Sequence, residues 1–142
     1  MTNYDEYQKF IRYKYGHHSF LLVLILVFIN SWLSLFRDIQ WAETKELETM
    51  LLIFIAVIYS IVMNTYHGAY FNRKQSPKIY AFIFFILGIV NIYLALSPYT
   101  PLIVDRKVTL HSLTVVSAIL WLSIPAAYLM RRFVDIKREK ED

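Results

Sequence analysis

Four long stretches of this chain contain no charged residue. All 15 Lys and Arg and all 11 Asp and Glu residues lie outside residues 15–36, 49–72, 79–104 and 108–130. An α-helix needs roughly 20 apolar residues to cross a hydrocarbon core about 30 Å thick, and a charge at the centre of that core costs on the order of 2.5–3.5 kcal/mol. The pattern therefore predicts an all-α integral membrane protein, a four-transmembrane-helix bundle with spans at about 15–36, 49–70, 78–97 and 108–130.

The segments between these stretches are too short to fold by themselves. Chains below about 40 residues usually need a metal, a disulfide or a partner to build a core. We therefore expect a single transmembrane domain over residues 1–142, whose function lies in the helices, at their ends or in a partner. The chain has no cysteine, which excludes thiol nucleophiles, disulfide exchange and cysteine-ligated metals.

Most Lys and Arg residues lie in three of the five segments outside the spans. Residues 1–14, 73–78 and 131–142 are rich in Lys and Arg, whereas residues 37–48 carry more acids than bases. Short segments rich in Lys and Arg stay on the cytoplasmic side of a membrane. We therefore expect both termini to be cytoplasmic and the chain to be a multi-pass protein of the cell (cytoplasmic) membrane. The net charge of +4 follows from this asymmetry, and no basic groove predicts binding to nucleic acid.

Two local features modify the simple picture of four straight spans. Tyr4, Tyr7 and Ile11 follow one another at intervals of three and four residues, which predicts a short amphipathic N-terminal helix over about residues 3–14, lying in the cytoplasmic interface. Pro125 falls inside the fourth stretch. Because proline lacks a backbone N–H, we expect a kink in the fourth helix at that point.

Small and polar residues recur within the apolar stretches. The candidate intramembrane polar or packing positions are Asn30, Ser34, Ser60, Asn64, Gly88, Asn91 and Pro125. Residues of this kind let helices approach closely in lipid and form hydrogen bonds between them. In one interpretation these faces meet in the core of the bundle. In the other, Asn30 and Asn91 lie at similar depth and line a polar site or path. They also begin two similar segments, 30–35 and 91–96, as a tandem duplication of a helical hairpin would produce.

Groups that could carry chemistry are sparse in the spans. The four uncharged stretches contain no Asp, Glu, Lys or Arg, and the third span has only Lys78 at its first position. This argues against proton-coupled transport, because that process needs an ionisable relay inside the membrane. His17, His18 and His67 are expected at one interface. Adjacent residues of a helix point about 100° apart, so His17 and His18 cannot easily share one metal ion. The motifs H-E-x-x-H and G-x-S-x-G are absent from the sequence, although they mark metalloproteases and serine hydrolases. We therefore predict no enzyme activity, no catalytic residue, no cofactor and no metal site.

The sequence leaves two main hypotheses for function. The first is a small polytopic membrane protein that acts by intramembrane helix–helix interaction, as an accessory, regulatory or immunity-type subunit. The alternative is a small channel or non-proton-coupled transporter formed by self-association, with polar side chains as its lining. The expected partners are the lipid bilayer and either a homo-oligomer or another membrane protein. A membrane-permeabilising protein of the holin type and a metal-dependent membrane enzyme rank below these two.

Overall fold

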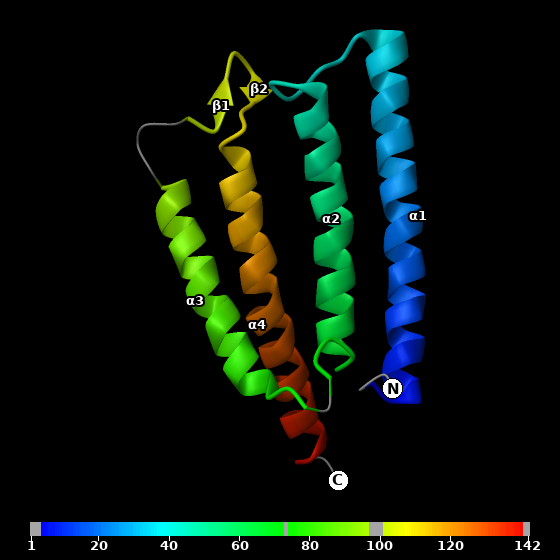
Figure 1. The fold of residues 1–142 in the computed structure, drawn as a ribbon, viewed down its shortest axis with the longest axis vertical. Coiled ribbons are helices and arrows are strands. Elements are labelled where there is room, and N and C mark those ends of the chain that lie inside the picture. Colours follow the sequence, from blue (N-terminus) through cyan, green and yellow to red (C-terminus); the bar gives the residue numbers. More distant parts are fainter. Residues whose placement is uncertain (1–3, 73, 97–100, 141–142) are drawn as a thin grey trace.

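Four α-helices make up most of the chain. The computed structural model describes residues 4–72, 74–96 and 101–140. Helix α1 spans Glu6–Arg37, α2 Lys45–Tyr66, α3 Pro77–Ala95 and α4 Ser112–Arg138 (Figure 1). All four are long and apolar enough to cross a membrane, as the charge-free stretches predicted. A short hairpin, β1 (Ile103–Val104) paired with β2 (Lys107–Val108), lies before α4.

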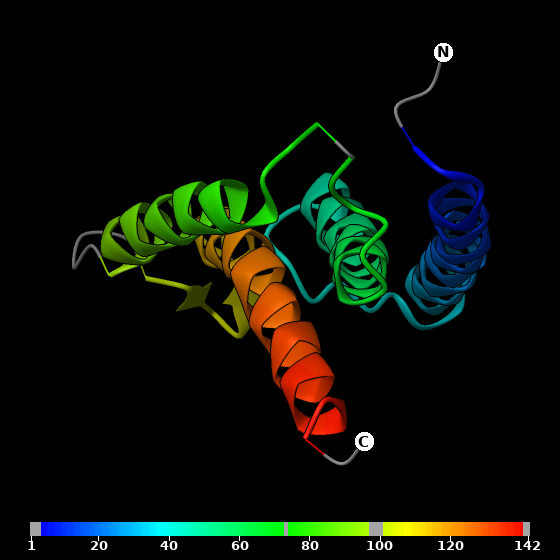
Figure 2. The same ribbon diagram turned by 90° about the horizontal axis from the view of Figure 1, so that it is seen from below.

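The helices form an open, bent row rather than a closed bundle. Helix α3 packs on α4, α4 on α2, and α2 on α1, so that α1 and α3 lie at the two ends of the row (Figures 1 and 2). The expectation that the small and polar faces of all four helices meet in one core is therefore wrong. For helices in a membrane, lipid chains are as apolar as the side chains between helices, so no hydrophobic force would close such a row.

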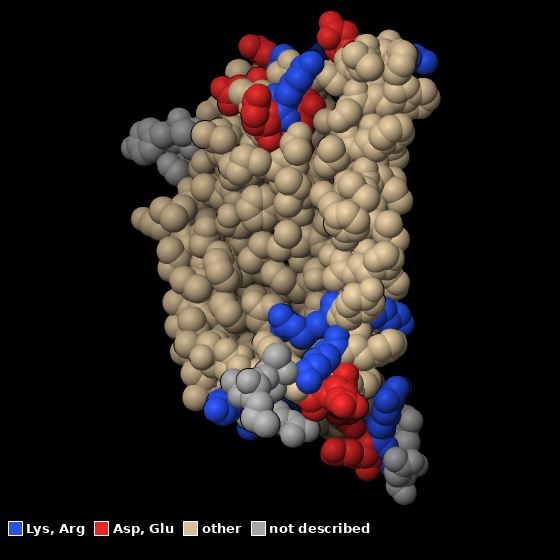
Figure 3. Space-filling view, turned by 45° about the vertical axis from the view of Figure 1, so that its right-hand side comes forward, with Lys and Arg blue, Asp and Glu red and all other residues tan. Residues whose placement is uncertain are grey.

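Along the helix axes, the molecule has two ends that hold different segments. Both termini lie at one end together with residues 67–72, and we call this the terminal end (Figure 1). Residues 38–44 and the β1–β2 hairpin lie at the other, which we call the hairpin end. On the face shown in Figure 3, Lys, Arg, Asp and Glu gather at the two ends and leave a wide uncharged belt between them. Such a belt is the surface that a hydrocarbon core requires.

Helix α1 begins at Glu6 and continues without interruption to Arg37, so the predicted separate amphipathic helix over residues 3–14 is wrong. Gln8 N donates to the Asp5 carboxylate at 2.7 Å, and Asp5 N donates to the Gln8 side chain at 3.3 Å. This reciprocal capping starts the helix, and no proline follows to stop it. The amphipathic face packs on protein instead of lipid, since Ile11 and Tyr15 are buried in a cluster with Ala69.

The most extensive helix contact joins α3 and α4. Gly88 is buried, and the Leu122 side chain of α4 occupies the space where a Cβ atom at position 88 would lie. The Phe84 ring stacks on Trp121, with ring centres 5.5 Å apart. Pro125 is buried within α4 and does not end the helix. A residue without a side chain at position 88 therefore sets how closely these two helices approach.

The β1–β2 hairpin was not predicted from the sequence. Asp105 and Arg106 form its turn with φ of 48° and 65°, the left-handed backbone that two-residue hairpin turns require. Val108 N donates to Trp41 O at 2.9 Å, and Glu43 N donates to Val108 O at 2.8 Å. The hairpin is thereby attached to the loop between α1 and α2, and α4 begins after it.

Candidate functional site

A carboxylate is fully buried at the hairpin end. The Glu48 side chain is 0% exposed. Its Oε1 accepts hydrogen bonds from Trp41 N at 2.7 Å and Ala42 N at 3.2 Å, and its Oε2 accepts from Asn30 Nδ2 at 3.0 Å. Asn30 Oδ1 in turn accepts from Trp41 Nε1 at 2.7 Å. We call Asn30, Trp41 and Glu48 the Glu48 cluster; it joins α1, the 38–44 loop and α2.

The local sequence places Glu48 at the start of α2. Thr44 caps the helix by accepting a hydrogen bond from Leu47 N at 3.1 Å, so Glu48 lies in the first turn, where a helix favours negative charge. Glu48 directly precedes the predicted second span, which starts at residue 49, so its burial was not predicted from the sequence. One signal was present in the sequence: the apolar residues Leu47 and Leu51 lie four residues apart on one helix face beside Glu48. In the structure both are buried in the same small core.

A polar hollow lies next to the Glu48 cluster. It has a volume of about 500 Å³ between the hairpin ends of α1 and α2. Its lining includes Asn30, Ser34, Lys45, Glu48 and Thr49. Two of the predicted positions, Asn30 and Ser34, therefore do face one polar space. The Glu48 carboxylate accepts three hydrogen bonds there, and these link the 38–44 loop to both helices.

A second, more apolar groove separates α1 from α2, closer to the terminal end of the two helices. It has a volume of about 340 Å³ and is lined by Ser19, Phe20 and Val23 of α1 and by Ile53, Ala56 and Ser60 of α2, among others. Across residues 16–37, all of which the structure describes, α1 has no fully buried residue. The middle of α1 therefore stands beside α2 without interlocking with it.

Asn64 and Ser60 form a local unit near the terminal end of α2. Asn64 Nδ2 donates to Ser60 O at 2.7 Å and to Ser60 Oγ at 3.2 Å. The backbone carbonyl of Asn64 accepts from Ala69 N at 2.7 Å and Tyr70 N at 3.1 Å. Asn64 therefore helps to end α2 and fold the following residues back against it, which is a structural role.

Asn91 is not brought to Asn30. Its Nδ2 donates to Leu87 O at 2.9 Å within α3, and α3 lies at the far end of the row from α1 (Figure 1). The interpretation that these two asparagines line one polar path within a single chain is therefore wrong. A side-chain amide that bonds the carbonyl four residues earlier satisfies itself inside its own helix.

Two of the histidines contact tyrosine side chains of a neighbouring helix. His67 Nε2 lies 2.9 Å from Tyr15 Oη, and the two rings stack with centres 5.1 Å apart. His18 Nδ1 lies 3.5 Å from Tyr59 Oη. Within the described part of the chain, no three His, Asp or Glu side chains are grouped closely enough to hold a metal ion. Tyr15 and His67 instead connect α1 to the end of α2.

Comparison of the chain with protein-family models, with curated proteins and with solved structures gave no match.

Proposed function

We propose that this chain is a multi-pass protein of the cytoplasmic membrane, with its terminal end in the cytoplasm, that acts by intramembrane helix–helix contact. In this proposal it has no catalytic site of its own and serves as an accessory, regulatory or immunity-type subunit of another membrane protein. The orientation is supported by the three Lys- and Arg-rich segments, which meet at the terminal end.

The observation that carries the proposal is the open row. Helix α1 leaves the groove at Ser60 and Ala56 unfilled, and its middle has no fully buried residue. Grooves lined by small residues are where helices approach each other in lipid. Asn30 and Glu48, two polar groups that could have served chemistry, are engaged in internal hydrogen bonds. A packed face is all that this mode of action requires.

Filling the groove should weaken association without unfolding the protein. Ser60 lines a hollow of about 340 Å³, so a leucine fits there. We expect Ser60→Leu to reduce recovery of a co-purifying membrane protein, after extraction in mild detergent, about ten-fold. Its melting temperature should stay within about 2 °C of wild type, because Asn64 Nδ2 loses only its longer hydrogen bond to Ser60 Oγ and keeps the one to the Ser60 carbonyl. Leu24→Phe is the control, since Leu24 lies on α1, is 50% exposed and is not part of the groove.

Self-association into a small channel or non-proton-coupled transporter is the second candidate, and the polar hollow at Asn30, Ser34 and Lys45 favours it. Purified protein in sealed vesicles separates the two. The contact proposal expects no solute uptake and no proton flux under an imposed pH gradient. A wild-type chain that purifies without any partner and drives uptake, which Ser34→Leu abolishes in a folded protein, would contradict the contact proposal and establish the second candidate.

A further inference from the structure

A small cavity at the terminal end is lined mainly by side chains that can donate hydrogen bonds. It has a volume of about 210 Å³ and is lined by Tyr7 of α1, Tyr66 and His67 at the end of α2, and Arg131, Asp135 and Arg138 of α4. Three helices therefore contribute to one cavity, although α1 and α4 lie on opposite sides of α2. Neither the helix-contact proposal nor the Glu48 cluster uses these residues.

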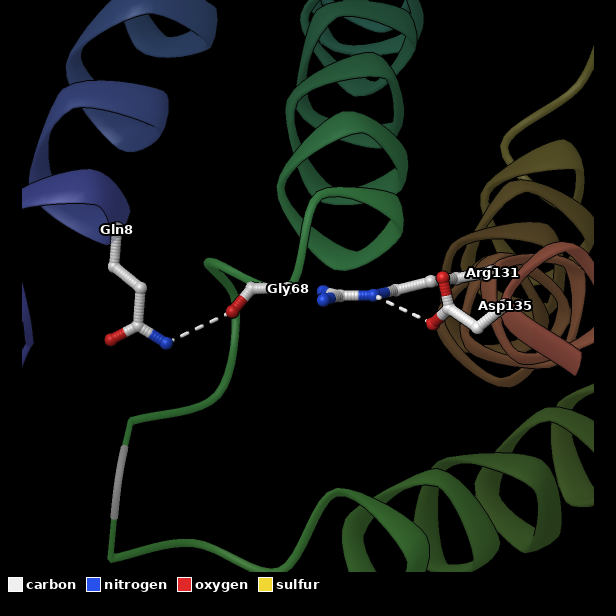
Figure 4. A network of polar contacts seen from close by, with 4 residues as sticks. All are labelled: Gln8, Gly68, Arg131 and Asp135. Carbon is white, nitrogen blue, oxygen red and sulfur yellow. Dashed lines mark hydrogen bonds and ion pairs between the residues drawn. The ribbon is translucent and has the colours of Figure 1, made fainter. Parts of the chain in front are cut away.

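Arg131 is placed in the cavity by an unusual backbone contact. Gly68 follows α2 with φ of 71°, and a Cβ atom at this position would collide with the Arg131 guanidinium. Figure 4 shows the guanidinium extending from α4 toward Gly68, whose carbonyl accepts from Gln8 Nε2 at 2.9 Å on the other side. A glycine is required here both for its left-handed backbone and for the space that the arginine occupies.

Most of the hydrogen-bonding capacity of Arg131 remains unused. Its Nε lies 3.6 Å from Asp135 Oδ2, a contact too long for a strong hydrogen bond, and both side chains are about half exposed. Among the residues that the structure describes, no other ionic partner of Arg131 lies within reach. The ion pair is on the Nε side, so the two Nη groups keep their donors. A guanidinium with free Nη donors matches the oxygen atoms of a phosphate.

The surroundings of the cavity are net positive. Arg131 and Arg138 outnumber Asp135 in its lining. The Lys14 ammonium and Arg131 are both close enough to act on the His67 ring electrostatically. The hydroxyl groups of Tyr7 and Tyr66 add neutral donors. Arg131 is the first residue after the uncharged stretch 108–130, so in a membrane the cavity lies at the depth where lipid headgroups begin.

From this geometry we infer that the Arg131 cavity binds a phosphate group, for which an anionic phospholipid headgroup is the source available at this depth. The guanidinium of Arg131 provides the direct contact, and Arg138 and the tyrosine hydroxyls complete the set of donors. Soluble phosphate carries the same chemistry, so the experiment includes both sources. The inference does not depend on how the protein functions within the membrane.

The test measures lipid binding to purified full-length protein in neutral detergent, by native mass spectrometry with phosphatidylglycerol and with phosphatidylcholine. We expect Arg131→Gln to weaken phosphatidylglycerol binding about ten-fold. Arg132→Gln is the matched control, because Arg132 is the next residue of α4, has the same charge and does not line the cavity; it should change binding less than about two-fold. Arg131→Lys keeps the charge but loses the planar fork, and it should bind more weakly than wild type.

The outcomes are distinct. Equal losses in Arg131→Gln and Arg132→Gln would indicate general attraction to a basic surface and would overturn the inference. Equal binding of the two lipids by wild type would also overturn it, because the choline of phosphatidylcholine neutralises the phosphate charge that Arg131 and Arg138 are inferred to recognise. If Arg131→Gln lowers the melting temperature of the lipid-free protein, Arg131→Lys decides the matter, and wild-type affinity in that variant would also overturn it. Competition by millimolar inorganic phosphate, lost in Arg131→Gln, would support the site with soluble phosphate as its ligand.

Discussion

Replacing Glu48 with alanine is expected to lower the melting temperature of the protein in detergent by roughly 10 °C. This corresponds to a decrease of about 3 kcal/mol or more in the free energy of unfolding. The substitution removes the acceptor of three hydrogen bonds, from Trp41 N, Ala42 N and Asn30 Nδ2. Each buried donor left without a partner costs on the order of 1–3 kcal/mol, unless water reaches it. Glu48 is 0% exposed, but the adjacent hollow can supply water, so the three costs do not add in full.

The conservative change Glu48→Gln should fall between alanine and wild type. Glutamine keeps one oxygen for the backbone donors but turns its amide toward Asn30 Nδ2, so that donor faces donor. Asn30 cannot turn its side chain over, because its Oδ1 already accepts from Trp41 Nε1. Glu46→Ala is the control, because Glu46 lies in the same helical turn and is exposed. This substitution should lower the free energy of unfolding by less than about 1 kcal/mol. Equal losses at Glu46 and Glu48 would show that the cluster has no structural role.

Replacing Gly88 with leucine is expected to have the other large effect, lowering the free energy of unfolding by about 3 kcal/mol. A Cβ atom at Gly88 would collide with the Leu122 side chain, and it would lie only 3.4 Å from Leu122 N. The α3–α4 contact must therefore open, and it is the most extensive contact between helices. The measurement is the melting temperature of the purified protein, compared with that of wild type in the same detergent.

Gly16→Leu provides the matched control for Gly88→Leu. Gly16 lies within α1, and nothing in the described structure is within 4 Å of a Cβ atom placed there. Both substitutions exchange a helical glycine for the same better helix former, so only their packing differs. We expect Gly16→Leu to leave the melting temperature unchanged or slightly raised. If the two variants melted at the same temperature, the assigned packing of α3 on α4 would be incorrect.

The four helices could be predicted from the sequence because a hydrocarbon core would leave an uncharged stretch of this length few structures other than a helix. Inside hydrocarbon, a backbone must satisfy its own polar groups, and an uninterrupted helix does so within one segment. Helix α2, for example, ends at Tyr66, ahead of Gly68, a residue type that helix C-termini favour. How the helices pack was much harder to predict, because apolar faces in lipid have no single preferred partner.

Asn30 and Asn91 illustrate why the polar positions could not be assigned from sequence. Both precede an aromatic residue and two leucines at the same spacing, yet Asn30 bonds Glu48 and Trp41 across the α1–α2 connection, whereas Asn91 bonds its own helix. The difference comes from residues 41–48, which contact α1 through Trp41 and Glu48. The 30–35 and 91–96 segments themselves give no sign of this contact. The same holds for Gly68 and Arg131, which are distant in sequence and meet only in the fold.

Cysteine accessibility tests the central claim, that these helices cross a membrane with the terminal end in the cytoplasm. The chain has no native cysteine, so single cysteines at Glu43, Lys74 and Leu24 report without background. All three positions are exposed in the structure and would label equally in a water-soluble protein. We predict that an impermeant maleimide labels Glu43→Cys in intact cells and Lys74→Cys only after permeabilisation, and that it labels Leu24→Cys in neither state, because a thiol in hydrocarbon does not react. Labelling of Leu24→Cys in permeabilised cells, or protection of Glu43→Cys together with labelling of Lys74→Cys in intact cells, would contradict the account.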